Sequence, residues 1–98
     1  MKLIVAIVRP FVIERLLVAW ENIENFPGVT VTDTEGFGQR TRTAEDAINP
    51  FKPNKRIEIV ASEELVAPII AAIKEYAHTG RKGDGFVIVL NIEDSTLI

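Results

Sequence analysis

Apolar and polar positions follow two patterns along this chain, one typical of strands and the other typical of helices. Residues 2–8 are apolar after Lys2 and rich in β-branched side chains, which is typical of a strand covered on both faces. Arg9 and Pro10 end this strand. Over residues 11–24, apolar side chains recur at steps of three and four, the signature of a one-sided amphipathic helix. The pattern therefore predicts a strand followed by a helix.

The later segments repeat these patterns. Residues 29–38 begin as a run of valine and threonine and end in Gly-Phe-Gly, which predicts a strand. Residues 55–61 alternate charged and apolar positions, as expected for a strand with one exposed face. Residues 62–78 carry apolar side chains at helical spacing behind a serine and two glutamates, which predicts a capped helix. Residues 86–92 predict the last strand.

A polar interval, residues 39–54, separates the second and third strands and has no sustained period of either kind. We interpret it as a loop. Loops longer than about 12 to 15 residues are uncommon in compact domains and tend to be functional or mobile. This segment is therefore either a binding arm or a disordered hairpin tip.

The order β-α-β-loop-β-α-β predicts an α+β fold, the ferredoxin-like sandwich, in one domain spanning residues 1–98. In this fold both helices lie on one face of a four-stranded antiparallel sheet. The other face must then meet water or another subunit. Because 47% of the residues are hydrophobic, more than a small monomer needs, we expect contact with other copies of the chain.

Composition excludes several classes of protein. A net charge of −3 disfavours nucleic acid as a partner. With no cysteine and the single histidine His78, the chain cannot form a His/Cys metal cluster. Its apolar runs are too short to cross a bilayer, and it does not begin like a signal peptide, so we expect a cytoplasmic protein that is not embedded in a membrane.

Two function classes share some of these features. An RNA-recognition module has the same order of elements, but it needs stacked aromatic side chains on its central strands, where this chain has valine and isoleucine. A small enzyme using Asp84 and His78 lacks a paired nucleophile and base. The sequence therefore predicts a protein that is neither an enzyme nor an RNA-binding module.

The segment Thr79–Gly85 holds three glycines within six residues, together with Arg81 and Lys82. Glycines let several N–H groups converge on one point, and the two cations add positive charge, so this loop is a candidate anion cradle. The alternative is a glycine-rich helix end with two solvated cations.

Five segments together resemble the PII nitrogen-regulatory signalling family in order and spacing, as a divergent PII-like branch. They are residues 2–11, 30–32, 36–38, 56–60 and 79–85. The Thr-Gly-x-x-Gly-Asp-Gly element is similar to the B-loop of that family. Its combination with Gly-Phe-Gly at the base of a long central loop is more specific than either motif alone.

The resemblance implies a homotrimer without catalysis, with adenine nucleotides in the clefts between subunits. It also implies a protruding T-loop, here residues 39–54, that docks on a membrane transporter or a metabolic enzyme. The nucleotide-binding positions carried over are Ile7, Thr30, Gly36, Phe37, Gly38, Val60, Arg81, Lys82, Gly83, Asp84 and Gly85. Ile7 and Val60 are equally consistent with ordinary strand residues, and Gly36 and Gly38 with a bulge. The partner-binding loop would include Arg42, Glu45, Asp46 and Phe51, with Arg40 beside a small anion such as bicarbonate.

Departures from the family pattern change the expected ligand. Phe86 stands where the family usually has a lysine, and residues 94–98 lack the usual Arg-x-Arg pair. Since each charge-assisted phosphate contact contributes about 1.5 to 3 kcal/mol, we expect ADP or AMP to be favoured over ATP, with no metal required. The order Gln39-Arg40 is reversed relative to the family, which puts the Mg-ATP-2-oxoglutarate response in doubt. The alternative function is a trimeric interaction scaffold of the same fold without a ligand.

Overall fold

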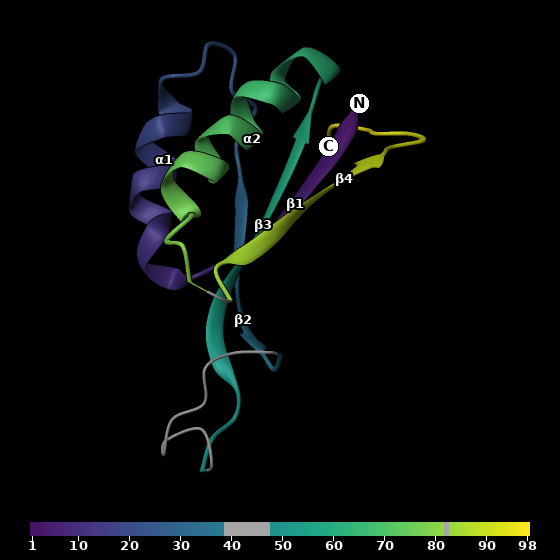
Figure 1. Cartoon of the computed structure of the whole chain (residues 1–98). Helices are drawn as coiled ribbons and strands as arrows, with labels where there is room; N and C mark the ends of the chain where they lie inside the picture. Colours follow the sequence, from purple (N-terminus) through teal and green to yellow (C-terminus); the bar gives the residue numbers. More distant parts are fainter. Residues whose placement is uncertain (39–47, 82) are drawn as a thin grey trace.

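Four antiparallel strands form one sheet, and two helices cover one of its faces (Figure 1). This computed structural model describes residues 1–38, 48–81 and 83–98. The elements in chain order are β1 (Lys2–Val8), the 3₁₀ helix η1 (Pro10–Val12), α1 (Ile13–Glu21), β2 (Thr30–Gly36), β3 (Lys52–Ala61), α2 (Glu63–Ala77) and β4 (Gly85–Asn91). The predicted α+β class and order of elements are confirmed.

The strands lie in the order β2-β3-β1-β4, so β1 and β3 are central. Val8 pairs with Lys55 of β3 on one side and with Gly85 of β4 on the other. The two chain ends meet at the far end of the sheet, where the Ile92 amide donates to the Met1 carbonyl over 3.2 Å (Figure 1). The glycine loop Thr79–Gly85 and the base of the long loop therefore share the opposite end.

The core lies between the sheet and the two helices. Trp20 of α1 is fully buried, stacks on Phe26 with ring centroids 5.7 Å apart, and donates its indole N–H to the Ile69 carbonyl of α2 over 3.3 Å. This bond satisfies the one polar group of a large buried side chain. It also connects α1 to α2 within the core.

The face without helices is apolar over β1 and β4. Alternation along β1 directs Ile4 and the other core positions toward the helices, and directs Val5 to the opposite face. Val5 pairs with Ile88, which is 45% exposed. The apolar residues on this open face are Leu3, Val5, Ile7, Val60, Phe86, Ile88 and Leu90. Val5 itself is 3% exposed, but a monomer would leave Val60, Phe86, Ile88 and Leu90 between 40% and 58% exposed to water.

The predicted boundaries of several elements were wrong. Strand β3 begins at Lys52, three residues before the expected start, so residues 52–54 of the predicted loop belong to the sheet. Pro53 has no N–H to donate to a neighbouring strand. It is tolerated because it pairs only with Glu35 of β2 and lies beyond the end of β1, so its other side needs no hydrogen-bond donor. The first helix starts as η1 and ends at Glu21, and β4 starts at Gly85.

No helix in the parts of the chain that the structure describes is long and apolar enough to span a membrane.

Candidate functional site: a glycine-walled cleft

A cleft of about 400 Å³ lies at the loop end of the sheet, where residues of all four strands line it. Ile7 pairs with Phe86, and both side chains lie on the open face of the sheet beside the cleft. Its lining residues are Ile7, Thr34, Glu35, Gly36, Phe37, Gly38, Asn54, Gly83, Gly85 and Phe86. The four glycines allow a bound molecule to approach the backbone closely on two sides.

The cleft offers aromatic faces and backbone groups more than positive charge. Phe37 is 62% exposed and Phe86 is 58% exposed, although both line a concave site. Among the lining residues that the structure describes there is no lysine or arginine. A planar apolar group could pack against these rings, and polar atoms of a ligand would meet main-chain groups and the side chains of Thr34, Glu35 and Asn54.

The base of the long loop contacts the same cleft. Phe37 packs against Phe51, with ring centroids 5.9 Å apart and planes at 51°. Phe51 lies directly before β3. Asn54, near the start of that strand, is buried and lines the cleft. An occupant that moved Phe37 would therefore also move the segment that leads into the loop.

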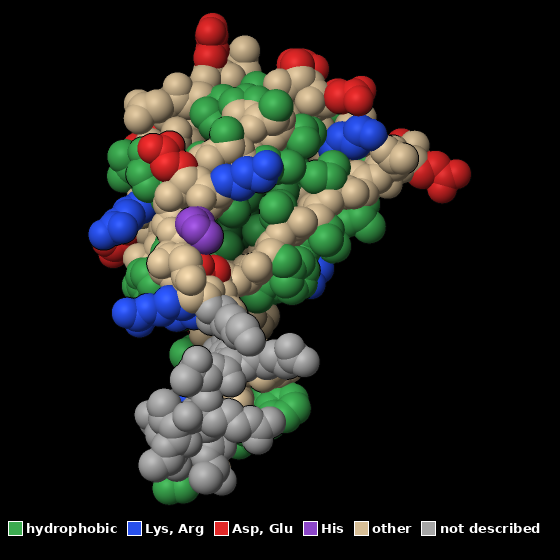
Figure 2. Space-filling view, viewed as in Figure 1, with side chains coloured by type: hydrophobic (Ala, Val, Ile, Leu, Met, Phe, Trp, Pro, Cys, Tyr) green, Lys and Arg blue, Asp and Glu red, His purple; other side chains and the backbone are tan. Residues whose placement is uncertain are grey.

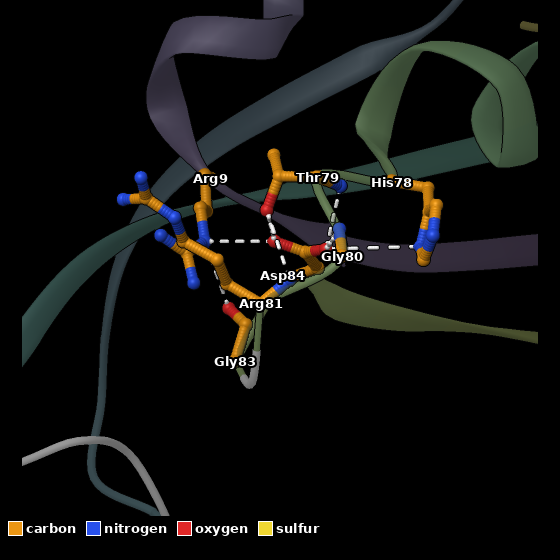
Figure 3. Close-up of polar contacts among 7 residues, drawn as sticks. All are labelled: Arg9, His78, Thr79, Gly80, Arg81, Gly83 and Asp84. Carbon is orange, nitrogen blue, oxygen red and sulfur yellow. Dashed lines mark hydrogen bonds and ion pairs between the residues drawn. The ribbon is translucent and has the colours of Figure 1, made fainter.

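The second wall of the cleft is the glycine loop, and Asp84 holds it closed (Figure 3). The Asp84 carboxylate accepts hydrogen bonds from the Thr79 amide over 2.6 Å, from the Gly80 amide over 3.1 Å, and from the Thr79 hydroxyl. His78 Nδ1 lies 3.8 Å from the same carboxylate. The N–H groups of this loop do converge on one point, as its glycines suggested, but the anion at that point is the chain's own Asp84.

Arg9 reaches this loop from the end of β1. Its Nε lies 3.2 Å from the Gly83 carbonyl oxygen, to which it donates, and 3.2 Å from Asp84 Oδ1 (Figure 3). Sequence reasoning missed Arg9 because 74 residues separate it from Gly83. Its position directly after a central strand was the one available signal.

These contacts set the charge state of Asp84. Burial of the carboxyl group works against ionisation, but hydrogen bonds from the Thr79 hydroxyl and amide, the positive charge of Arg9 and a hydrogen bond from the Gly80 amide outweigh it. Together they hold the pKa of Asp84 below its ordinary value. The carboxylate is thus charged whenever the loop is in this conformation near neutral pH.

Gly85 brings the loop back to the sheet at a point where no side chain fits. Its φ is +119°, and a Cβ there would collide with the Ile7 carbonyl oxygen and lie 2.9 Å from the Ile7 carbonyl carbon. Gly85 and Phe86 line both the cleft and a smaller cavity of about 150 Å³ between α2 and β4. Figure 2 shows hydrophobic side chains gathered over α2 and along β4 on that side.

The structure brings together six of the predicted nucleotide-binding residues. Ile7, Gly36, Phe37, Gly38, Gly83 and Gly85 line the cleft. Asp84 and Arg81 belong to the same loop but do not line the cleft. Lys82, Arg40, Arg42, Glu45 and Asp46 lie outside the described residues. The structure adds Thr34, Glu35 and Asn54, whose positions no motif marked.

Thr30 and Val60 lie away from the cleft of their own chain. Thr30 pairs with Glu58, six residues from Gly36 along β2, which places it roughly 20 Å away at about 3.3 Å per residue. Val60 pairs with Leu3 near the other end of β1. Paired residues of neighbouring strands point to the same face of the sheet. Val60 pairs with Leu3 of the open face, so it lies on that face. Thr30 pairs with Glu58, which in turn pairs with Val5 of the open face, so Thr30 lies there too.

The fold and the cleft define a ferredoxin-like α+β domain with a ligand-sized site at the loop end of its sheet. Residues 1–98, the whole chain, match the family described as Nitrogen regulatory protein P-II. The chain therefore belongs to the P-II nitrogen regulatory protein family.

Individual relatives agree with this membership. The chain is 40% identical to a nitrogen regulatory protein P-II of Bradyrhizobium diazoefficiens, with 100% of this chain and 91% of the relative covered. It is 38% identical to the protein of that name from Azospirillum brasilense, over 96% of this chain and 88% of the relative. A Rhodospirillum rubrum protein of the same name is 38% identical, over 100% and 91%. These relatives are named as regulatory proteins and not as enzymes.

The geometry at Gly85 predicts a large difference between two glycines of the cleft. We expect Gly85→Ala to lower the free energy of unfolding by roughly 2 kcal/mol or more, because a strained backbone costs about 1 to 3 kcal/mol and the new Cβ meets Ile7. Gly38→Ala is the matched control, with open space around its Cβ, and should change stability by less than about 0.5 kcal/mol. Urea unfolding followed by circular dichroism measures both. Equal stability of the two variants would contradict this account of Gly85.

The lowered pKa of Asp84 predicts a dependence of stability on acid. A carboxyl group whose pKa is lower in the folded state stabilises the fold above its unfolded pKa, and this contribution is lost as pH falls through the folded pKa. We expect Asp84→Asn to remove this part of the acid dependence and to be less stable than the wild type at pH 7. Asp94→Asn, at an exposed carboxyl group beyond β4, is the control. Melting temperatures between pH 2 and pH 7 test the difference, and parallel curves for wild type and Asp84→Asn would count against it.

Proposed function

We propose that this chain is a cytoplasmic, trimeric signal-transduction protein that binds an adenine nucleotide in clefts between subunits. It regulates a partner, either a membrane transporter or a metabolic enzyme, through the loop that lies between β2 and β3. The observation that carries the proposal is the cleft, which unites Gly36–Gly38 of one wall with Gly83 and Gly85 of the other. Membership of a family of regulatory proteins supports the signalling role.

The open face of the sheet supports association with other copies. Ile88, Leu90 and Val60 are each 40% exposed or more on a surface that no helix covers. Burying this surface between subunits would remove apolar area from water at about 25 cal/mol per Å². Thr30 and Val60, which lie far from the cleft of their own chain, are on the same face. A neighbouring subunit would thus supply them to complete a shared site.

The chemistry of the cleft supports a ligand with few phosphates. The described lining residues include exposed aromatic rings and main-chain groups but no lysine or arginine, and Phe86 lies beside the glycine wall. An adenine or ribose would find apolar and hydrogen-bonding surface there. A third phosphate would find little compensation for the water it loses. ADP or AMP is therefore the preferred nucleotide, and ATP is the weaker ligand.

One observation favours the second candidate, a ligand-free interaction scaffold. The Thr79 and Gly80 amides already donate to Asp84, so the glycine loop holds its shape without a bound anion. A protein that had lost its ligand would need such an internal substitute. The scaffold would still associate through the open face and still present the loop to a partner.

Titration calorimetry with ATP, ADP and AMP tests the nucleotide proposal. We expect ADP and AMP to bind more tightly than ATP. Phe86→Lys should tighten ATP binding on the order of tenfold or more, because a new charge-assisted phosphate contact contributes about 1.5 to 3 kcal/mol. Phe11→Lys is the matched control, since Phe11 is 61% exposed on η1 and does not line the cleft. If none of the three nucleotides binds at millimolar concentration, the sensor proposal is lost and the scaffold remains.

The open face predicts a variant that separates the subunits. Ile88→Glu places a charge beside Val5 at the centre of the apolar surface, and burying that charge between subunits is costly. We expect the trimer to dissociate into monomers that keep their secondary structure. Val18→Glu is the control, because Val18 is 61% exposed on α1. Light scattering after size-exclusion chromatography measures the mass, and a trimeric Ile88→Glu variant would place the interface elsewhere.

A further inference from the structure

We propose that Arg9 is the positioning residue of the cleft: it holds the glycine loop, and so the wall formed by Gly83 and Gly85, in the conformation that accepts a ligand. For the identity of that ligand this inference rests on the proposed function. The hold of Arg9 on the loop does not depend on it.

Arg9 contacts the loop at two adjacent residues. Its Nε lies 3.2 Å from the Gly83 carbonyl oxygen and 3.2 Å from a carboxylate oxygen of Asp84. The side chains of Arg9 and Asp84 are 25% and 15% exposed, so this ion pair is better shielded from water than pairs on the surface. One guanidinium therefore fixes both the carbonyl of a wall residue and the carboxylate that closes the loop.

The loop needs such fixing because its backbone is rich in glycine. Gly80, Gly83 and Gly85 have φ values of +83°, +83° and +119°. Glycines lose more conformational freedom on folding than any other residue, so specific contacts must offset that loss. Asp84 supplies contacts at the start of the loop, through Thr79 and Gly80, and Gly85 pairs with Val8 at its end. Arg9 connects these two ends.

Arg9 is itself held on a rigid base. It lies between β1 and Pro10, the first residue of η1, and its carbonyl accepts a hydrogen bond from the Val12 amide over 3.3 Å. Two residues earlier on the same chain segment, Ile7 also lines the cleft, beside Gly85. The segment from Ile7 to Arg9 thus fixes one cleft residue directly and the glycine wall through Asp84.

A positioning role has a signature that a direct ligand contact would lack. The Asp84 carboxylate accepts hydrogen bonds from Thr79 and Gly80 and forms an ion pair with Arg9. Neither Asp84 nor Arg9 lines the cleft. Loss of Arg9 should therefore weaken every ligand by the same factor. A residue that bound phosphate would instead weaken ADP more than AMP.

The experiment is a double-mutant cycle on the full chain, with ADP and AMP as the probes. We expect Arg9→Met to weaken both nucleotides about tenfold, in line with the loss of one charge-assisted hydrogen bond. Arg9→Lys should restore part of that loss. Because Arg9 acts partly through Asp84 and partly through the Gly83 carbonyl, Arg9→Met and Asp84→Asn together should weaken binding by less than the product of the two single losses. Arg15→Met removes the same side chain from an exposed position on α1 and is the control.

Amide hydrogen exchange supplies a readout that needs no ligand. In Arg9→Met, the Thr79 and Gly80 amides should exchange about tenfold faster, while amides in the centre of β1 and in Arg15→Met should exchange at the wild-type rate. Arg9→Lys gives the same comparison if Arg9→Met does not fold.

Two results overturn the inference: exchange at Thr79 and Gly80 that does not change without Arg9, and a loss of ADP binding that clearly exceeds the loss of AMP binding. If the wild type binds neither nucleotide, the proposed function fails instead. Exchange at these two amides then decides whether Arg9 positions the loop.

Discussion

The structure depends most on the close passage of Gly85 over the carbonyl group of Ile7. No other residue fits there, because any Cβ would collide with the Ile7 backbone. This passage joins β4 to β1 in register, with Val8 opposite Gly85 and Ile7 opposite Phe86. Both the cleft and the apolar open face depend on that register, since it places Ile7 and Phe86 in the cleft and Val5 and Ile88 on the open face. A shift by one residue would move every such side chain to the opposite face.

The glycine loop keeps its converging N–H groups in place with a carboxylate of the same chain in the position of a bound anion. Loops that gather N–H groups usually need an anion to offset the converging dipoles. Here Asp84 supplies the charge, and Arg9 balances it. A ligand in the cleft would meet a wall that is already formed, so binding would not have to order it. Preformed walls of this kind reduce the entropy cost of association.

Much of the fold could be predicted from the sequence, because hydrophobic spacing reports which side of an element is buried. The start of β3 could not, since Pro53 is unfavourable in a strand unless one side of the strand has no partner, and only the register shows that β1 stops at Val8. In the site, Gly36 and Gly38 were predictable only from the resemblance of Gly-Phe-Gly to the PII family, since the residues alone are equally consistent with a bulge. Arg9 and Asn54 were not, because their roles arise from contacts between distant parts of the chain.

Strand β1 also connects the two properties that the proposed function requires. Val5 and Ile7 are two residues apart, so their side chains lie on the same face, Val5 at the centre of the apolar surface and Ile7 in the cleft. Packing another subunit against Ile88, which covers this face beside Val5, would restrain the strand that carries Ile7 and leads into Arg9. Association would thus stabilise the empty cleft before any nucleotide entered it. By linkage, a nucleotide that preferred this restrained cleft would in turn strengthen the association.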